Sequence, residues 1–356
     1  MARQEPKSKH LRFLVVGAGA IGGYFGASLS LAGHPVDFLA RGDTALRLET
    51  AGLSLRNGES FQTARPGVVR VEAAQMAGEY DCWILAVKSY QLSDALEPLL
   101  TSAASVPAVL CLLNGVEGED WLSLRIGREK VIAGSVTTAV GRPDNASVVV
   151  ERPRGVGLAG DHPLVDTLVA VFQVAGLHAR RYFDPNNMKW SKLITNLPAN
   201  SLAAILNLTP LEIYSRPDLF RLERFQLREA LEVMQRMGLR VVDLPGARAR
   251  LLAIAARSLP AGLSLPLLRR AIGTGRGTKM PSLHIDLYRG ARYSEVSVLN
   301  GAVVRRAASL GIPTPVNSFL TDKLLAMVAG RVPVDTYSGH PEKLLAEFEA
   351  VDRNKR

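Results

Sequence analysis

Short apolar runs alternate with helical patterns along the first third of the chain. The runs that are typical of buried strands lie at residues 12–16, 35–40, 81–87, 108–113 and 131–136. Between them, the spacing of apolar residues predicts helices over residues 18–31 and 91–100. Strands that alternate with helices predict a parallel, doubly wound sheet with helices on both faces. We expect residues 147–160 to add a strand and a turn to that sheet.

The pattern changes at the turn formed by residues 182–185. Beyond it the pattern contains no strand-like runs, and residues 188–206, 219–237 and 297–310 have helical spacing. Within residues 222–237, one apolar stripe is formed by Leu222, Phe225, Ala230, Val233 and Met237. We therefore expect the second half of the chain to be all-helical.

These patterns divide the chain into two domains of ordinary size. An α/β domain with a doubly wound parallel sheet is expected over residues 11–183, followed by an all-helical C-terminal domain over residues 184–345. Charged tails are expected at residues 1–10 and 346–356, and the segment from Glu342 is expected to be a frayed helix.

The chain is basic, with 43 Lys+Arg against 33 Asp+Glu in 356 residues and a formal charge of +10. Such a charge favours anionic partners, which include nucleic acids, membrane surfaces and small phosphorylated or carboxylated molecules. The most basic segment, residues 240–279, contains no aromatic residue, whereas single-strand binders stack bases on aromatic side chains. We expect helices whose arginines reach solvent, and neither nucleic acid nor membrane as a partner.

A charge-free stretch covers residues 13–36 and follows a basic start, as in a secretory signal or a membrane span. Six glycines interrupt it, and each weakens a lone helix by up to about 1 kcal/mol relative to alanine. A strand, a turn and a helix account better for the same residues.

The cysteines and histidines give no sign of a disulfide framework or a metal site. Cys82 and Cys111 lack the paired spacing of zinc ligands and lie on predicted strands, so we expect packed core thiols in a cytoplasmic protein. The six histidines show no ligand spacing either, and we predict no metal.

A glycine pattern lies between the first predicted strand and the first predicted helix. Residues 17–22 read Gly-Ala-Gly-Ala-Ile-Gly, which matches G-x-G-x-x-G. In a Rossmann-type domain, Gly17 would make a tight turn, Gly19 would admit a pyrophosphate, and Gly22 would let helix and strand pack closely. Ala20 and Ile21 would open the helix whose N-terminus faces the phosphates.

Cations at the ends of two predicted strands favour NADP(H) over NAD(H). Arg41 follows the second strand, where an NAD site usually carries an acidic residue for the ribose. Lys88 follows the third strand and is a second cation at the carboxyl edge of the sheet. Asp37 lies too early, inside its strand, whereas Asp43 could compete for the ribose. The alternative for Arg41 is an ordinary solvated loop arginine.

Polar residues recur at the start of the helical half. Lys192, Asn196 and Asn200 are four residues apart in a mostly apolar segment and share one face while the helix continues. Pro198 cannot donate to the carbonyl of Ile194, so we expect a kink that moves Asn200 off this stripe. The alternative is an exposed helix face, with Lys189 as another surface charge.

The residues that carry a family resemblance lie in both halves. They are Val15–Gly22, Ala86–Gln91, Leu113–Gly115, Lys189–Asn196 and Ser294–Gly301. Over roughly residues 11–330 the chain resembles ketopantoate reductase (2-dehydropantoate 2-reductase). The K-x-x-x-N stripe, followed about 100 residues later by S/T-E-x-x-x-x-N-G, is its most specific feature.

The resemblance implies NADPH-dependent reduction of 2-dehydropantoate to pantoate, a step of pantothenate and CoA biosynthesis. It implies that Lys192 is the general acid and that Glu295 is the catalytic, substrate-binding carboxylate. Positions that bind the substrate would be Asn196, Asn200 and Ser282, with Asn114 at the junction of cofactor and substrate. Arg41 and Lys88 match the cations that hold the adenosine 2′-phosphate. The alternative for Glu295 is a carboxylate that favours a helix N-terminus.

Two departures from the family pattern concern the substrate. Ser297 stands where the family often has Asp, and His284 stands where Gln is common. A related enzyme for another small 2-oxo acid or ketone therefore stays as an alternative. A non-catalytic protein that senses NADPH is a further alternative, from another class. A homodimer is compatible with any of them.

Overall fold

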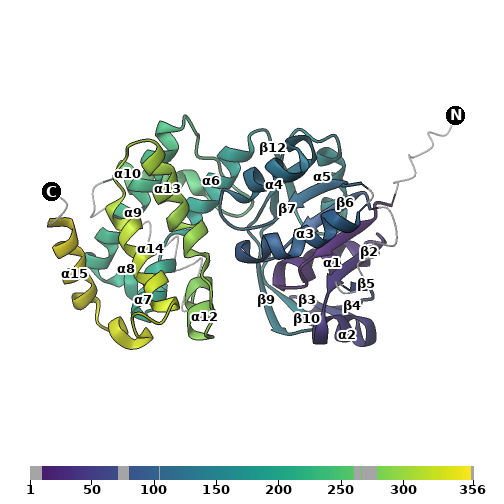
Figure 1. The fold of residues 1–356 in the computed structure, drawn as a ribbon, viewed down its shortest axis with the longest axis horizontal. Coiled ribbons are helices and arrows are strands. Elements are labelled where there is room, and N and C mark those ends of the chain that lie inside the picture. The colour runs from purple at the N-terminus through teal and green to yellow at the C-terminus, as the bar shows by residue number, and fades with distance from the viewer. Residues whose placement is uncertain (1–9, 71–79, 104, 260–265, 267–278, 354–356) are drawn as a thin grey trace. The chain divides into compact units, whose positions relative to one another are not determined.

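The computed structural model describes residues 10–70, 80–103, 105–259, 266 and 279–353. Most of the expected N-terminal tail, the last three residues and much of the basic segment 240–279 lie outside the described residues. Two compact units are formed, one from the residues up to 113 with 118–185, the other from 114–117 with the residues from 186 onward. Figure 1 shows the strands in the first unit and the helices of the second.

The first unit is built on an eight-stranded sheet in the order β12-β11-β8-β7-β6-β1-β2-β5. The strands are β1 (Phe13–Val16), β2 (Val36–Ala40), β5 (Gly67–Arg70), β6 (Cys82–Leu85), β7 (Ala108–Cys111), β8 (Val131–Val136), β11 (Val156–Ala159) and β12 (Ala179–Tyr182). All neighbours are parallel except β11 and β8, which pair antiparallel. The predicted doubly wound, mainly parallel sheet is confirmed.

Both faces of this sheet are covered. The helices of the unit are α1 (Ala20–Leu31), α2 (Gly42–Ala51), α3 (Leu92–Ser102), α4 (Gly118–Ile126) and α5 (Leu164–Val174). Alternate residues of the central strands enter separate cores, with Phe13 and Val15 in one and Leu14 and Val16 in the other. Period-two alternation sends successive side chains to opposite faces, which is why these runs are apolar throughout. Cys82 and Cys111 are fully buried in β6 and β7, as predicted.

A second sheet, which the sequence pattern did not predict, has the order β4-β3-β10-β9. Its strands are β3 (Leu53–Asn57), β4 (Ser60–Ala64), β9 (Ala139–Asp144) and β10 (Ser147–Arg152). The expectation that residues 147–160 extend the main sheet is therefore wrong for β10 and correct only for β11. In β10, Val148 and Val150 are buried while Val149 is only half-buried. Such one-sided burial suits a strand that covers a helix, not the core of a parallel sheet.

Helices make up the second unit. They are α6 (Pro185–Asn196), α7 (Asn200–Leu206), α8 (Pro210–Ser215), α9 (Pro217–Arg236), α10 (Ala249–Arg257), α12 (Ser282–Tyr288), α13 (Asn300–Ser309), α14 (Pro315–Val328) and α15 (Pro341–Arg353). Short 3₁₀ turns precede α13 and α15, namely η4 (Glu295–Val298) and η5 (Val334–Tyr337). Among the described residues beyond 186, the β pairing is limited to one bridge between Leu244 and Ala247. The prediction of a helical second half is confirmed.

Two details of the helical half differ from the prediction. Phe225 is 40% exposed, and polar Gln226 is buried instead. The buried side of α9 therefore differs from the expected apolar stripe, because it includes the polar residues Glu223 and Gln226 and leaves Phe225 exposed. The helix α15 runs to Arg353 with Leu344 fully buried, so the expectation of a frayed helix from Glu342 is wrong.

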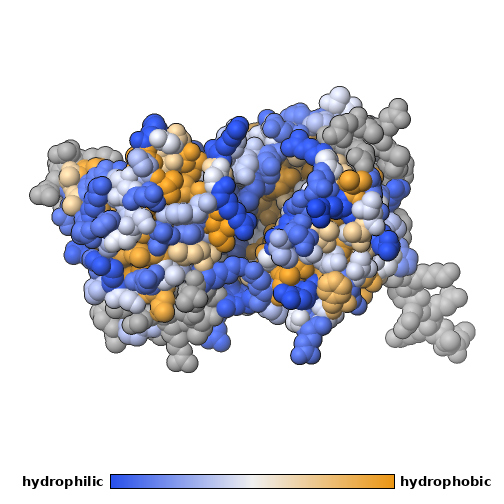
Figure 2. Space-filling view, turned by 90° about the horizontal axis from the view of Figure 1, so that it is seen from below, coloured by the Kyte–Doolittle hydropathy of each residue, from blue (hydrophilic) through white to orange (hydrophobic). Residues whose placement is uncertain are grey.

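The charge-free stretch 13–36 forms β1, the glycine turn, α1 and the start of β2. In the part of the chain that the structure describes, no helix has both the length and the apolar character that a membrane span requires. The face in Figure 2 carries many hydrophilic side chains, with apolar ones in separate patches.

Candidate functional site

The glycine turn has the backbone that the sequence motif predicts. Gly17 has φ +103°, and a Cβ there would lie 2.8 Å from Val87 Cγ1 and 2.9 Å from the Ala86 carbonyl oxygen. A Cβ on Gly22 would lie only 1.8 Å from the Gly17 carbonyl oxygen. Glycine is thus required at both positions by the fold itself.

Gly19 is different, because nothing in the described structure lies within 4 Å of the place where its Cβ would be. Its φ of −76° is open to any residue. The fold does not demand glycine here, but a phosphate close to the backbone would. Gly19 caps α1, and the backbone N–H groups of the first turn, which begins at Ala20 and Ile21, attract anions. This turn fits a dinucleotide pyrophosphate.

The acidic residues near the end of β2 are engaged in other contacts. Asp37 accepts hydrogen bonds from Arg12 Nη2 at 3.0 Å and Tyr80 Oη at 2.9 Å. Asp43 accepts from Asn145 Nδ2 and Arg47 Nε, both at 2.9 Å, and these bonds lower its pKa. Arg41 lies between Asp37 and Asp43 in the sequence and is the exposed N-cap residue of α2. An exposed guanidinium beside a helix N-terminus suits a phosphate.

The predicted break after Asn196 is confirmed. Helix α6 ends at Asn196 and α7 begins at Asn200, with Ala199 in the left-handed region at φ +55°. Lys192 and Asn196 are half-buried and one turn apart on α6. Asn200 is 3% exposed, and its Oδ1 accepts a hydrogen bond from the Leu283 backbone N–H at 3.2 Å. It thereby holds the start of α12, where Ser282 is exposed.

Three residues from distant segments meet in the helical unit. Asn114 Nδ2 donates to Glu295 Oε2 at 3.2 Å, and Asn196 Nδ2 donates to Asn114 Oδ1 at 3.5 Å. Glu295 is 2% exposed and begins η4, which Ser294 caps through its Oγ. The carboxylate of Glu295 therefore contacts a side-chain amide as well as starting a helical turn. Asn114, Asn196 and Glu295 form one polar cluster that continues along α6 towards Lys192.

Lys189 is not the surface charge of the alternative interpretation. It lies on α6 and is 4% exposed, and its neighbours Met188 and Trp190 are buried as well. The exposed-face interpretation of this helix is wrong at that position.

A buried polar network behind the cluster was missed in the sequence. Ser201 Oγ donates to Asn300 Oδ1 at 2.7 Å, and Asn300 Nδ2 donates to Gln226 Oε1 at 2.6 Å and to Asn317 Oδ1 at 3.0 Å. Glu223 Oε2 accepts from the Ala199 N–H at 2.8 Å, at the break after α6. The network thus joins the segment that carries Asn196 to the helix that follows Glu295. The sequence signal for this network was Glu223 and Gln226, two polar residues three positions apart on the buried side of α9.

Glu229, at the edge of this network, should make stability depend on pH. Its carboxylate accepts from the N–H groups of Val316 and Asn317 at 2.8 and 2.9 Å, but burial raises its pKa from 4.5 to about 7. The folded protein holds this proton more tightly than the unfolded chain. The contribution to stability is therefore complete below pH 4.5 and is lost as the pH rises through 7, by up to about 3 kcal/mol.

Urea unfolding between pH 5 and pH 8 tests this expectation. The variant Glu229→Gln should lose much less stability over that range than the unsubstituted protein. Glu232→Gln, on the same helix and in an exposed ion pair with Arg236, should behave as the unsubstituted protein does. Parallel pH profiles for the protein and Glu229→Gln would contradict the assignment.

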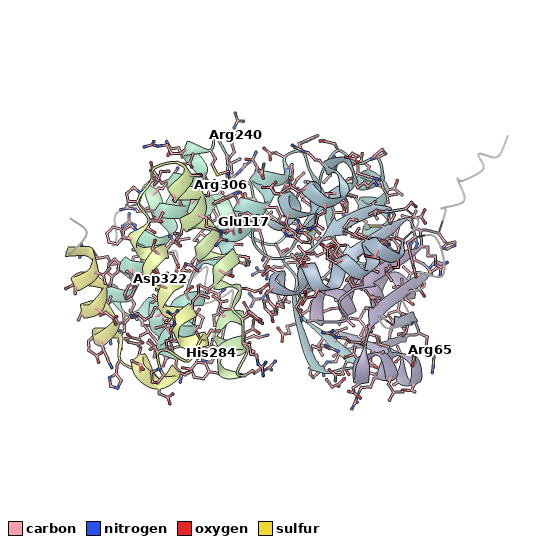
Figure 3. All side chains as sticks on the ribbon, in the orientation of Figure 1. Arg65, Glu117, Arg240, His284, Arg306 and Asp322 are labelled. Carbon is pink, nitrogen blue, oxygen red and sulfur yellow. The ribbon has the colours of Figure 1, made fainter. Side chains whose placement is uncertain are left out.

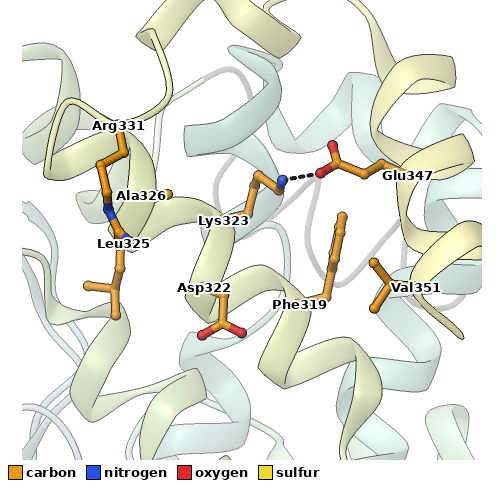
Figure 4. Close-up of a pocket in the computed structure, with 8 residues that line it drawn as sticks. All are labelled: Phe319, Asp322, Lys323, Leu325, Ala326, Arg331, Glu347 and Val351. Atoms are coloured by element: carbon orange, nitrogen blue, oxygen red, sulfur yellow. Dashed lines mark hydrogen bonds and ion pairs between the residues drawn. The ribbon is translucent and has the colours of Figure 1, made fainter. Parts of the chain in front are cut away.

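A cavity of about 410 Å³ lies in the helical unit, between α14 and α15 (Figure 4). It includes Phe319, Asp322, Lys323 and Glu347 but no residue of the polar cluster. Lys323 Nζ is paired with Glu347 and lies 5.5 Å from the centre of the Phe319 ring. Because the ammonium of Lys323 is already paired with a carboxylate, we assign no ligand to this cavity. No group of acidic residues, histidines or cysteines suited to a metal ion occurs among the described residues.

Comparison with protein families gives two matches that cover both units. Residues 13–160 match the family model described as ketopantoate reductase PanE/ApbA, and residues 184–328 match that of its C-terminal part.

Sequence identity to the individual proteins described below is between 20% and 27%. A 2-dehydropantoate 2-reductase of Archaeoglobus fulgidus is 27% identical over 326 residues, which cover 90% of this chain and 98% of the relative. The crystal structure of a PanE/ApbA family ketopantoate reductase from Ralstonia eutropha has a TM-score of 0.77 at 26% identity, over 90% of this chain and 99% of that one. A D-mandelate dehydrogenase solved with NADH and anilino(oxo)acetate has a TM-score of 0.76 at 20% identity, with the same coverage, and shares the fold.

Proposed function

Because the chain belongs to the ketopantoate reductase PanE/ApbA family, a family of oxidoreductases, we propose that it reduces the keto group of 2-dehydropantoate to give pantoate with NADPH. The reaction would serve pantothenate and CoA biosynthesis. The observation that carries the proposal is the cluster of Asn114, Asn196 and Glu295, one helical turn from Lys192.

The side chains have chemically distinct tasks in this proposal. NADPH supplies the hydride, and negative charge then develops on the former ketone oxygen. The ammonium of Lys192 stabilises that charge and donates the proton. The amides of Asn196 and Asn114 orient the substrate without adding charge. The carboxylate of Glu295 accepts a hydrogen bond from the substrate hydroxyl, while Ser282 and Asn200 complete the polar contacts.

For the cofactor, we propose that Gly17, Gly19 and Gly22, with the first turn of α1 at Ala20 and Ile21, hold the pyrophosphate. Arg41 and Lys88 hold the 2′-phosphate. The contacts that already engage Asp37 and Asp43 support this choice, since they take the carboxylates near β2 away from a ribose hydroxyl.

Replacing Arg41 with alanine tests the preference for NADPH. We expect the dissociation constant of NADPH to rise by about tenfold or more, equivalent to about 1.4 kcal/mol, while that of NADH changes little. Fluorescence titration with both cofactors measures the ratio. Arg65→Ala removes an exposed arginine from the same unit (Figure 3) and should leave both constants unchanged. Equal losses for the two cofactors in Arg41→Ala would contradict a 2′-phosphate contact.

A second candidate is the reduction of another small 2-oxo acid. His284 and Ser297 depart from the family pattern, and the fold also serves the D-mandelate dehydrogenase. A panel of 2-oxo acids, starting with 2-dehydropantoate and assayed by NADPH oxidation, separates the candidates. Fastest turnover of 2-dehydropantoate supports our proposal, and fastest turnover of another acid replaces the substrate. Cofactor binding without turnover of any acid would favour an NADPH sensor.

A further inference from the structure

Residues Asn114–Glu117, which we call the strap, follow β7 and precede α4 but pack with the helical unit. Each strap residue has its own attachment there. Asn114 donates to Glu295, and Val116 is 8% exposed within the helical core. Gly115 has φ +87°, and a Cβ on it would lie 2.7 Å from the Val298 carbonyl oxygen. The strap backbone therefore lies directly against the turn that carries Glu295.

Glu117 closes the strap through an ion pair with Arg305 of α13. Arg305 Nε donates to Glu117 Oε1 at 2.9 Å, and Nη2 donates to Oε2 at 2.5 Å. The same Nη2 donates to the Ser297 carbonyl oxygen of η4 at 2.8 Å. One guanidinium thus binds both the end of the strap and the turn of Glu295. Figure 3 labels Glu117.

A glycine on α13 leaves room for the guanidinium of Arg305. Gly301 lies one turn before Arg305, and a Cβ there would lie 3.2 Å from Arg305 Nη1. A planar fork that meets both carboxylate oxygens also fixes direction, which a single ammonium contact does not.

We propose that Glu117 and Arg305 are positioning residues that hold the Asn114 amide on the Glu295 carboxylate, and so set the geometry of the substrate site. This inference rests on the proposed function, which gives Asn114 and Glu295 their substrate contacts. Neither Glu117 nor Arg305 touches the substrate in it.

The exposure of the pair argues against a mainly stabilising role. The side chains of Arg305 and Glu117 are 51% and 40% exposed, and exposed ion pairs contribute only about 0–1 kcal/mol to stability. Small displacements of a substrate-orienting group, by contrast, cost far more in rate than in stability. The variant proteins should therefore fold normally and react slowly.

The test compares Glu117→Gln, Arg305→Gln and the double variant. In each we expect kcat/KM for the keto acid to fall by about tenfold, with an unchanged dissociation constant for NADPH. The double variant should lose no more than Arg305→Gln alone, because that substitution already breaks the contact that Glu117→Gln breaks. Arg305→Lys should not restore activity, since an ammonium lacks the fork.

The Arg216–Asp218 pair provides a matched control. It is also an arginine with two contacts to one carboxylate in the helical unit, with side chains 45% and 41% exposed. Asp218→Asn should keep full activity. Normal kcat/KM in Glu117→Gln, or additive losses in the double variant, would overturn the inference.

Hydrogen exchange keeps the inference separate from the proposed function. Peptides that contain residues 113–118 and 294–299 should exchange faster in Glu117→Gln than in the unsubstituted protein or in Asp218→Asn. Unchanged exchange overturns the positioning role, whether or not the protein turns over 2-dehydropantoate. Inactivity of the unsubstituted protein on every 2-oxo acid, by contrast, overturns the proposed function.

Discussion

Replacing Lys192 with alanine should lower kcat for reduction of the keto acid by about 10³-fold, within the range of general acid catalysis, and leave NADPH binding intact. The ammonium lies on α6, one turn before Asn196, whereas the glycine turn belongs to the other unit. In the proposed function, its loss would remove the proton donor and the charge opposite the developing oxyanion. Single-turnover oxidation of bound NADPH measures the chemical step, and fluorescence titration measures cofactor binding.

Two further variants define the role of Lys192 more closely. Lys192→Arg keeps the positive charge but is a poor acid, so it should remain almost as inactive as the alanine variant. Lys343→Ala removes an exposed lysine from α15 and should retain full activity. Unchanged turnover in Lys192→Ala would show that Lys192 is not the proton donor.

The second large effect is expected at the glycine turn, where Gly19→Ala and Gly22→Ala should fail in different ways. A methyl group at Gly22 would lie 1.8 Å from a backbone oxygen, so it should destabilise the unit by about 1–3 kcal/mol, the usual cost of overpacking. A methyl group at Gly19 meets nothing within 4 Å, so the protein should fold normally. It would occupy the space of the pyrophosphate, however, and raise the NADPH dissociation constant at least about tenfold.

Thermal unfolding and NADPH titration of the two variants separate structural from ligand-binding glycines. Normal NADPH affinity in Gly19→Ala would show that the pyrophosphate does not lie against this residue. An unaltered melting temperature in Gly22→Ala would contradict the close approach of α1 to the turn.

Local patterns predicted the main sheet and the glycine turn because their signals lie within a few neighbouring residues. The glycine pattern spans only residues 17–22, and Gly22 packs against the Gly17 carbonyl oxygen five residues before it. The buried strands are apolar on both faces. Pro198 likewise marked the break in α6 correctly. The second sheet was missed because β4 is almost entirely exposed. Its sequence also lacks the alternation of apolar and polar residues that is typical of a half-buried strand.

The candidate site depended less on local pattern. Asn114 and Glu295 are 181 residues apart in sequence, and only the family resemblance suggested a common site for them. The network through Asn300 and Gln226 was missed for another reason. Buried polar residues are stable when they are hydrogen-bonded to each other, and that condition is not visible from the spacing on one helix.

The strap also limits how this protein can be cut. A fragment that begins at Asn186 would lack Val116, a member of its own hydrophobic core, together with the amide that meets Glu295. The first unit, expressed alone with 114–117 in place, would expose that same valine to water. A chimaera that exchanges the helical halves of two relatives would therefore need to transplant this four-residue insert along with them. The two units are separately compact, but the second unit is complete only with residues 114–117 from the first half of the chain.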